Sequence, residues 1–381
     1  MTQSRYLNNA GAGQISEGAF QSYIQHLELE REIGPAAAAA HNRDQYDAFY
    51  TNAADLIGAS SPNEVAFVDS ASRAWNTALT SITLCQGDKI VTLSSEFGTN
   101  LVSLYHRAAL AGASLEVVNC AQDGTFDLRK FEKSIQGAAL VAISHAVAHA
   151  SILNPVAEIG RRLRDTETVY LVDACQSLGQ VETRVDEIGC DALTATGRKW
   201  LRGPRGTGFL YVRDGSPLAA LEIDLACADL VFSEDSGLVT GVSIRKDARQ
   251  FELWERNVGG MIGLGHALGE LLSSDRNTLY RRTSELGRTI RAAVSDNNHL
   301  QLMGAVDAPV GNVGFYCRDA AMEDRVAAEL SAAGIIYSTM ADWDCPLHFP
   351  RGGQSKIFRV TPHYYTPDDV VAAACAVISG L

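Results

Sequence analysis

The sequence lacks several features that would assign it to a specialised class of protein. No run approaches the roughly 20 consecutive apolar residues of a membrane span. The N-terminus, residues 1–9, has no apolar core of a signal peptide, so the cytoplasm is the expected location. A formal net charge of −13 argues against the clustered positive charge that nucleic-acid binding requires. These absences predict a globular protein whose partner is a small-molecule substrate, with no nucleic acid and no membrane.

Regularly spaced cysteine pairs are absent as well. The eight cysteines stand singly, without Cys-x-x-Cys or zinc-type spacing. Such scattering favours buried thiols in a reducing compartment over a disulfide framework, and it predicts no metal site.

Lysine is scarce, and one lysine has unusual neighbours. Of the six lysines, five lie among polar or charged residues. Lys199 instead follows a short apolar run and precedes Gly203, Gly206 and Gly208. A lysine in a partly dry site loses its proton more easily and can form a Schiff base with a carbonyl group. Taken alone, the pattern is equally compatible with a surface lysine on a turn.

Strand-like and helix-like segments alternate through the first two thirds of the chain. Helix-length stretches separate short apolar runs at 65–68, 89–93, 114–118, 140–143, 169–172, 192–195 and 209–212. This alternation predicts an α/β fold with a mostly parallel sheet covered on both faces. Ligands of such sheets bind at the carboxyl ends of the strands, so the residues just after each strand are the candidates for a site.

The pattern changes near residue 264, where two long helical stretches precede further short strands and a final helix from Pro367. We therefore predict a large α/β domain over residues 16–262 and a smaller α+β domain over residues 263–381. The glycine- and asparagine-rich segment 1–15 is expected to join them.

A carboxylate and an amide follow the apolar run at 169–172. A buried Asp173 is costly unless it meets a cation or several donors, although aspartate also often caps a helix. Beside a Schiff-base lysine, Asp173 would suit the ring nitrogen of pyridoxal phosphate, because a protonated ring accepts electrons. Gln176 would then donate to the phenolate oxygen of the ring.

Three segments together resemble the class V aminotransferase and cysteine desulfurase family, whose members are pyridoxal-phosphate enzymes of fold type I. They are residues 172–177, 196–208 and 359–365, and the resemblance extends over nearly the whole chain. It implies a large domain with a mostly parallel sheet, a smaller α+β domain and pyridoxal 5'-phosphate as the cofactor. It also implies a homodimer.

The resemblance assigns roles to individual residues. Lys199 would carry the cofactor as a Schiff base, Asp173 would pair with the ring nitrogen and Gln176 would contact the phenolate oxygen. Arg359 would bind the substrate α-carboxylate, a role that suits its planar, two-pronged donor. The further residues expected to contact the cofactor are Phe97, Ser70, Ala71, Ser72, Thr196 and Arg198. Those expected to join Arg359 at the substrate are Asn9 and Trp254.

The expected phosphate site is the turn at residues 69–72, because a helix that begins there points its N–H groups at an anion. Ser70 and Ser72 are equally suited to capping that helix. Phe97 stands where many relatives have a histidine stacked on the ring, and an aromatic side chain can also stack there.

Three positions depart from the family pattern, and one of them is Cys175, which replaces the usual alanine and is expected to serve in packing. His149 follows Ala148, which stands where desulfurases often have an asparagine. His149 is therefore a catalytic candidate, with a packed or solvated histidine as the equal alternative. Glu255 replaces a threonine that binds phosphate across the dimer interface, which leaves that contact open.

The fold alone does not select the reaction. A desulfurase needs a thiolate on a mobile loop. Cys345 lies near the expected position, but Pro346 follows it and no cysteine-loop motif is recognisable. We predict a C–S lyase that acts by β-elimination on a cysteine-type substrate, with a cysteine desulfurase using Cys345 or a class V aminotransferase as alternatives. A cofactor-free binding protein is disfavoured because Lys199, Asp173 and Arg359 are all present.

Overall fold

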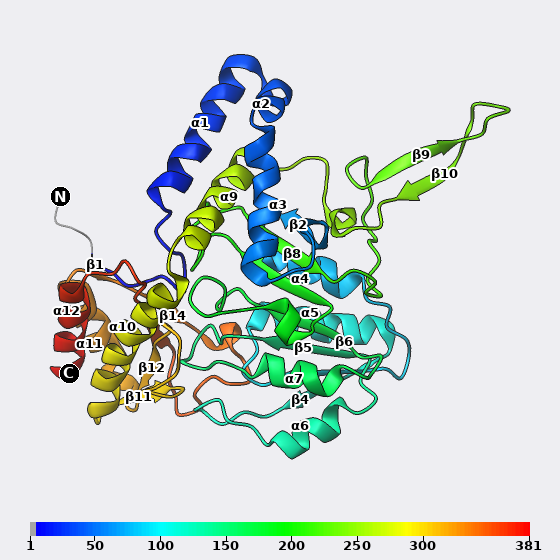
Figure 1. Cartoon of the computed structure of the whole chain (residues 1–381). Coiled ribbons are helices and arrows are strands. Elements are labelled where there is room, and N and C mark those ends of the chain that lie inside the picture. Colours follow the sequence, from blue (N-terminus) through cyan, green and yellow to red (C-terminus); the bar gives the residue numbers. More distant parts are fainter. Residues whose placement is uncertain (1–4) are drawn as a thin grey trace.

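A computed structural model describes residues 5–381, and its centre is a seven-stranded sheet (Figure 1). The sheet order is β2-β8-β7-β6-β5-β3-β4. In that order the strands are Val65–Val68, Gly208–Val212, Ala192–Thr196, Val169–Asp173, Leu140–Ser144, Lys89–Leu93 and Ser114–Val118. The strands from β7 to β4 run parallel, whereas β8 is antiparallel to both β7 and β2. The predicted α/β fold with a mostly parallel sheet is confirmed.

The strands are apolar throughout because both faces of the sheet are buried. Successive residues of a strand point to opposite faces. Leu171 belongs to the apolar cluster on one face and Val172 to the cluster on the other, and Leu140 and Val141 alternate in the same way. The helices that follow the strands are α4 (Ala71–Thr80), α5 (Gly98–Ala111), α6 (Leu128–Ile135), α7 (Val156–Leu163) and α8 (Val185–Ile188).

Four helices lie beside this sheet, and one helix from the middle of the chain joins three helices from the N-terminal part (Figure 1). They are α1 (Glu17–Ile33), α2 (Pro35–His41), α3 (Arg43–Ile57) and α9 (Val258–Ser273). Ser16 caps α1, and the Gly34–Pro35 step separates α1 from α2. Helix α9 packs against α1 and α3. It also continues across the proposed boundary at 262–263, and the division into two domains remains a prediction.

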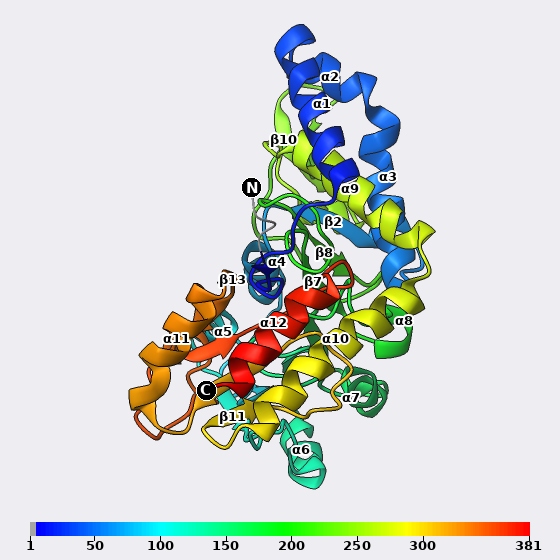
Figure 2. The same ribbon diagram turned by 90° about the vertical axis from the view of Figure 1, so that its left-hand side faces the viewer.

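The C-terminal part forms a second, smaller layer of sheet and helices (Figure 2). Its four-stranded antiparallel sheet has the order β11-β12-β15-β14, and β1 pairs with β13 in a separate two-stranded sheet. These strands are β11 (Leu300–Met303), β12 (Gly314–Cys317), β15 (Ile357–Arg359), β14 (Ser338–Met340), β1 (Arg5–Tyr6) and β13 (Ile335–Ile336). The helices are α10 (Arg276–Asp296), α11 (Glu323–Ala332) and α12 (Asp368–Ser379). Pairing of β1 with β13 joins the N-terminal segment to this layer.

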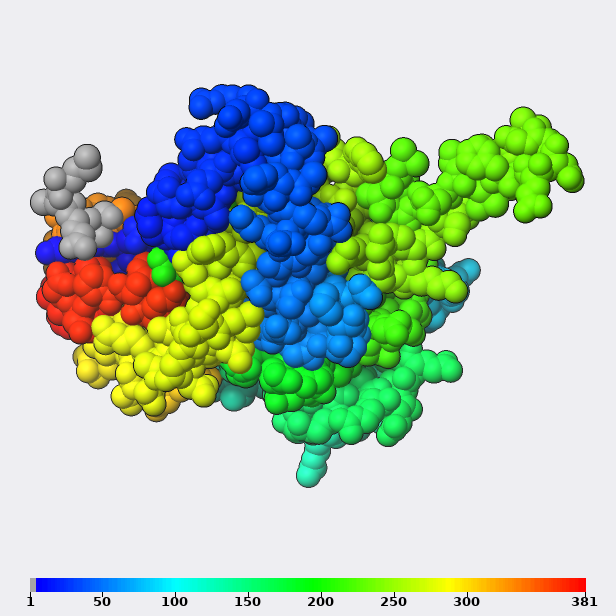
Figure 3. Space-filling model, turned by 45° about the horizontal axis from the view of Figure 1, so that its top comes forward, coloured from blue at the N-terminus to red at the C-terminus, as the bar shows by residue number. Residues whose placement is uncertain are grey.

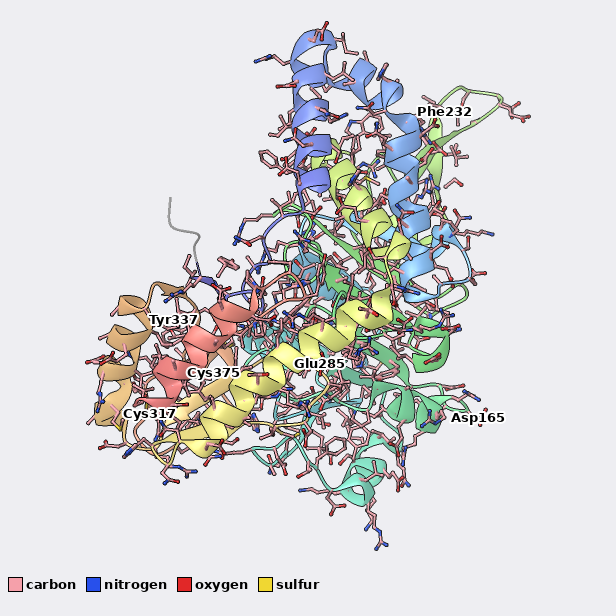
Figure 4. All side chains as sticks on the ribbon, turned by 60° about the vertical axis from the view of Figure 1, so that its left-hand side comes forward. Asp165, Phe232, Glu285, Cys317, Tyr337 and Cys375 are labelled. Atoms are coloured by element: carbon pink, nitrogen blue, oxygen red, sulfur yellow. The ribbon has the colours of Figure 1, made fainter. Side chains whose placement is uncertain are left out.

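A β-hairpin that the sequence pattern did not predict projects from the large layer (Figure 3). It consists of β9 (Ala228–Phe232) and β10 (Val239–Ile244), and nearly all of its residues are exposed. Phe232 lies on this projection in Figure 4 and is 57% exposed.

The short 3-10 helices are η1 (Pro62–Glu64), η2 (Ala248–Phe251), η3 (Ala320–Met322) and η4 (Asp342–Asp344). Among residues 5–381, no helix has both the length and the apolar character needed to cross a membrane.

Candidate active site

The candidate site is built at the carboxyl edge of the large sheet, where the ends of three strands lie side by side. Ser144, Asp173 and Thr194 are register partners on β5, β6 and β7. Asp173 is the last residue of its strand and is buried. Because these strands are parallel, the segments that follow them emerge at the same edge.

Lys199 lies in the tight connection between β7 and β8. The N-terminal segment crosses this connection, and Gly13 donates its N–H to Arg198 O (2.8 Å). A Cβ atom at Gly13 would lie 2.2 Å from Lys199 O, so only glycine permits this approach. The glycine-rich N-terminal segment therefore helps to fix the backbone that carries the lysine.

The third segment of the resemblance packs on the same connection. His363 is fully buried, and its Nε2 lies 3.2 Å from Trp200 O. The Arg202 guanidinium donates to the Tyr364 hydroxyl (2.8 Å) and lies 4.2 Å from the centre of the Tyr365 ring. Arg202 has a φ of +56°, a conformation that is unfavourable for arginine, and these contacts help to hold it there.

The surroundings of Lys199 favour loss of its proton. Desolvation lowers the pKa of its amine to about 8, and the charges of Arg198 and Arg359 act in the same direction. Asp173 and Cys175 oppose the shift. Within residues 5–381 the Nζ atom has no hydrogen-bond or ion-pair partner. Lys199 is therefore an amine with substantial nucleophilic and basic character near neutral pH.

Asp173 is held by three donors. Its Oδ1 accepts from the Cys175 N–H (2.8 Å) and from the Thr194 hydroxyl (3.3 Å). Its Oδ2 accepts from Asn100 Nδ2 (2.9 Å). A carboxylate has about four acceptor positions, so one position on Oδ2 remains for a further donor.

Two neighbours of Asp173 were not identified from the sequence. Glu96 follows β3 and is 1% exposed, and Asn100 lies in the first turn of α5 and is 4% exposed. Glu96 stands three residues after the end of β3, so it gives a weaker signal than Asp173, which ends its own strand. Its significance became visible only when the fold brought α5 against the end of β6.

Arg359 is a buried cation without an anionic partner. Its guanidinium donates to the Ser338 hydroxyl (3.0 and 3.1 Å) and to Ala148 O (3.2 Å). No carboxylate of residues 5–381 lies within 4 Å of it. Desolvation lowers its pKa to about 10, a sign that the charge is poorly solvated. Such a group is suited to an incoming carboxylate.

His149 is packed between the two layers of the chain. It is fully buried, and its Nε2 lies 2.8 Å from Nδ1 of His348, whose own Nε2 lies 3.0 Å from Ala121 O. Burial and the neighbouring His348 keep the pKa of His149 well below its usual value. The Nδ1 atom of His149 is buried and has no hydrogen-bond partner among the described residues.

The predicted phosphate turn begins α4. Ser70 is its N-cap and accepts from the Arg73 N–H (3.2 Å), so the capping role of this serine is confirmed. Gly208, at the start of β8, brings this turn against β7: a Cβ there would lie 3.4 Å from the Ser70 carbonyl carbon and 2.5 Å from Ala195 O. Thr196 ends β7, and the Arg198 guanidinium donates to Gly11 O.

The remaining predicted residues have varied surroundings. Gln176 Nε2 donates to Ala10 O (3.0 Å), and its Oε1 accepts from Trp200 Nε1 (2.8 Å). Both ends of the Asn9 amide are paired, with Thr361 O and the Tyr365 hydroxyl. Phe97 is half-buried at the start of α5. Trp254 is 66% exposed, whereas Asn9 is fully buried.

Two curated relatives indicate the chemistry found among similar sequences. A probable hercynylcysteine sulfoxide lyase from Mycobacterium tuberculosis is 28% identical over 378 residues, which cover 98% of this chain and 89% of the relative. A probable cysteine desulfurase from Pyrococcus abyssi is 29% identical over 251 residues, which cover 61% of this chain and 59% of the relative.

Solved structures share the fold. The apo structure of a cysteine desulfurase from Thermococcus onnurineus NA1 has a TM-score of 0.89 and 23% identity, and the match covers 99% of this chain and 94% of that one. A mutant of C-DES with glycine covalently linked to its pyridoxal-phosphate cofactor has a TM-score of 0.85 and 19% identity. That match covers 99% of this chain and 97% of the other.

Pyridoxal phosphate fits the groups that this chain brings together. Among residues 5–381, Lys199 offers an amine without a partner, Asp173 retains an acceptor position on Oδ2, and Arg359 is a buried cation without an anion. Residues 5–366 match the family described as Aminotransferase class-V. The chain therefore belongs to the class-V aminotransferase family and is an enzyme that depends on pyridoxal 5'-phosphate.

Proposed function

We propose that this enzyme cleaves the Cβ–S bond of a cysteine-type L-amino acid by β-elimination. The observation that carries the proposal is the state of Cys345, the cysteine nearest to the position of a desulfurase nucleophile. Its side chain is fully buried, and burial followed by the neighbouring Asp344 raises the pKa of the thiol to about 12. A desulfurase nucleophile must instead be an accessible thiolate.

The segment around Cys345 is packed rather than free. The backbone of Trp343 lies so close to α5 that a Cβ atom at Gly98 would be 1.9 Å from Trp343 O. The Cys345 carbonyl accepts from the His348 N–H (3.0 Å), and His348 contacts His149. These contacts favour a reaction in which the thiol takes no part. The M. tuberculosis relative, matched over 98% of this chain, is named a lyase.

Lys199 is the proposed base. When bound, pyridoxal phosphate supplies an aldehyde that takes up the amino group of the substrate and a ring that accepts electrons. The lowered pKa of Lys199 leaves a fraction of the amine neutral at physiological pH, and this neutral amine removes the α-proton. Asp173 holds the protonated ring nitrogen at its free acceptor position, and Arg359 holds the substrate carboxylate.

The other proposed contacts position the cofactor and substrate. The phosphate is held at the start of α4 by Ser70, Ala71 and Ser72, together with Thr196 and Arg198. Phe97 would pack on the bound ring, and the Gln176 amide would donate to its phenolate oxygen. His149 would contribute through its Nδ1, which has no hydrogen-bond partner among residues 5–381, and Asn9 and Trp254 would complete the substrate site.

The reaction balances without an oxidant or reductant. The Cα–H bond breaks with its proton passing to Lys199 Nζ, and the Cβ–S bond breaks with its electron pair leaving on sulfur. The carbon product is 2-aminoacrylate, which water converts to pyruvate and ammonia. The sulfur product takes up a proton.

Product analysis tests this proposal. Incubation with L-cysteine, cystine and cysteine sulfoxides is expected to yield pyruvate and ammonia in equal amounts, with little alanine. Cys345→Ala is expected to retain the native rate to within about twofold, because a buried thiol with a raised pKa supplies no nucleophile. Cys190→Ala, a second fully buried cysteine, is the control for packing.

Other products would select another reaction. Alanine that disappears in Cys345→Ala would identify a desulfurase. Exchange of the amino group with a 2-oxo acid, without release of sulfur, would identify an aminotransferase.

We also propose that the enzyme is a cytoplasmic homodimer and that the projecting hairpin contributes to the subunit contact. An isolated two-stranded hairpin is marginally stable in water, and a large exposed apolar patch usually marks an interaction site. The exposed apolar side chains on the hairpin are Leu230, Val231, Phe232, Leu238, Val239, Val242 and Ile244. Glu255, which replaces the family's cross-subunit threonine, is also exposed.

Sedimentation equilibrium of the loaded protein is expected to give twice the mass of one chain. Phe232→Asp should weaken the dimer by roughly 10- to 100-fold, because it places a charge where an apolar contact is expected. Ile33→Asp, which alters an apolar residue of similar exposure on α1, should leave the mass unchanged. A fully active monomer would refute the proposal.

A further inference from the structure

We propose that Asn100 and Glu96 are positioning residues for Asp173, and that together they set the electron-accepting strength of the bound cofactor. The proposal rests on the proposed role of Asp173 at the ring nitrogen of pyridoxal phosphate. It adds two buried side chains from α5 and the segment before it, neither of which is required to touch the cofactor.

The central contact is a bridge between two buried carboxylates. Asn100 Nδ2 lies 2.8 Å from Glu96 Oε1 and 2.9 Å from Asp173 Oδ2. An amide nitrogen has two hydrogens, so it can donate to both acids at once. This contact fixes the oxygen of Asp173 that retains a free acceptor position.

Glu96 is itself held by a full set of donors. Besides Asn100, the Phe97 N–H donates to Oε1 (3.0 Å), the Ser144 N–H donates to Oε2 (2.8 Å) and the Ser144 hydroxyl donates to Oε1. All of these contacts donate a hydrogen to the Glu96 carboxylate, and such donors favour its ionised form. Because both carboxylate oxygens of Glu96 are fixed, Glu96 holds the Asn100 amide in one orientation.

Electrostatics connects Glu96 to the site as well. Burial, followed by the charge of Asp173, raises the pKa of Glu96 to about 7, and the donors from Ser144, Asn100 and Phe97 oppose that shift. Asp173 on β6 is the ionisable group that acts on Glu96, since the donors from β5 and α5 are neutral. An ionised Glu96 adds negative potential behind Asp173 and favours a proton on the cofactor ring.

The hydrogen bonds therefore form a chain from the sheet to the ring position. Ser144 at the end of β5 fixes Glu96, Glu96 fixes Asn100, and Asn100 fixes Asp173. Loss of the Asn100 or Glu96 side chain should weaken binding of the cofactor and change the protonation of the cofactor. Loss of a buried polar contact elsewhere should affect stability alone.

The experiment compares Asn100→Ala and Glu96→Gln with wild type, each loaded with pyridoxal phosphate. The first readout is the cofactor dissociation constant, which is expected to rise about tenfold or more in Asn100→Ala, the size of a lost hydrogen bond to a charged group. The second is the pH midpoint of the cofactor's visible absorbance. In Glu96→Gln this midpoint is expected to fall by about half a unit or more, because a buried negative charge is removed.

Two control variants separate positioning from folding. Asn52→Ala removes a half-buried amide that donates to Gly265 O (2.9 Å), and Glu64→Gln alters a buried carboxylate that accepts from Ser60 and Asp214. Neither side chain contacts Asp173, so both readouts should stay at wild-type values. Ser144→Ala is a milder member of the series, since it removes one donor to Glu96 and should shift the midpoint in the same direction by less.

The outcomes distinguish this inference from the proposed function. If wild-type protein takes up no cofactor, the proposed function fails. If wild type loads normally and Asn100→Ala, Glu96→Gln and Ser144→Ala keep its dissociation constant and midpoint, the positioning role is overturned. Equal changes in the Asn52 and Glu64 controls would also overturn it, because they would indicate a general effect of packing.

Discussion

Lys199→Ala is expected to lower the rate of C–S cleavage by about 10²- to 10⁴-fold or more, the usual contribution of a positioned base, with loss of covalent attachment added to it. The reason lies in its setting: the amine has no partner among the described residues, and desolvation lowers its pKa to about 8. Initial rates of pyruvate release at saturating cofactor provide the measurement.

The control is Lys246→Ala, which alters an exposed lysine at the base of the hairpin and should keep full activity. Borohydride reduction of the loaded wild-type enzyme, followed by peptide mapping, should label Lys199. A label on Lys246 or Lys356, or a Lys199→Ala variant with native turnover, would remove Lys199 from the mechanism.

Arg359→Ala is expected to reduce kcat/KM by roughly 30- to 1,000-fold, the cost of removing one member of a buried charge pair with the substrate carboxylate (about 2–4 kcal/mol). The stability of the cofactor-free protein should change far less. In that state the buried guanidinium has no anionic partner and a lowered pKa, so its charge contributes little to folding.

Arg359→Lys is the graded variant, because lysine retains the charge and loses the two-pronged geometry. It should fall between wild type and Arg359→Ala in kcat/KM on an amino-acid substrate. Native kcat/KM in Arg359→Ala would mean that another group binds the carboxylate. A large loss of thermal stability in that variant would indicate a structural role instead.

Local sequence patterns were sufficient for most of the elements. The strand at Gly208–Val212 lies where the apolar run at 209–212 predicts one, and α4 begins after Ser70, a predicted helix cap. These elements follow from short-range causes, namely apolar runs, caps and glycine or proline stops, which a single sequence displays. The fold class followed because buried parallel strands need helices on both faces.

Other elements were missed because their stability comes from partners distant in the chain. β11 and β14 are short strands whose only pairing is with β12 and β15 in the antiparallel sheet. The hairpin of β9 and β10 carries apolar residues that remain exposed. Apolar runs usually indicate buried strands, so the sequence pattern does not indicate an exposed hairpin. The antiparallel placement of β8 is likewise a property of the sheet rather than of the segment.

The sequence by itself determined the residue types of the site, because Lys199, Asp173 and Arg359 each stand beside a strand end or glycine turn. Only the tertiary structure decided how these groups interact. It brought Asn100 within hydrogen-bonding distance of both Glu96 and Asp173, and it buried Cys345 beneath a packed segment. The physical reason is that pKa values and hydrogen-bond partners depend on burial and on neighbours from distant parts of the chain, and spacing along one chain does not specify either.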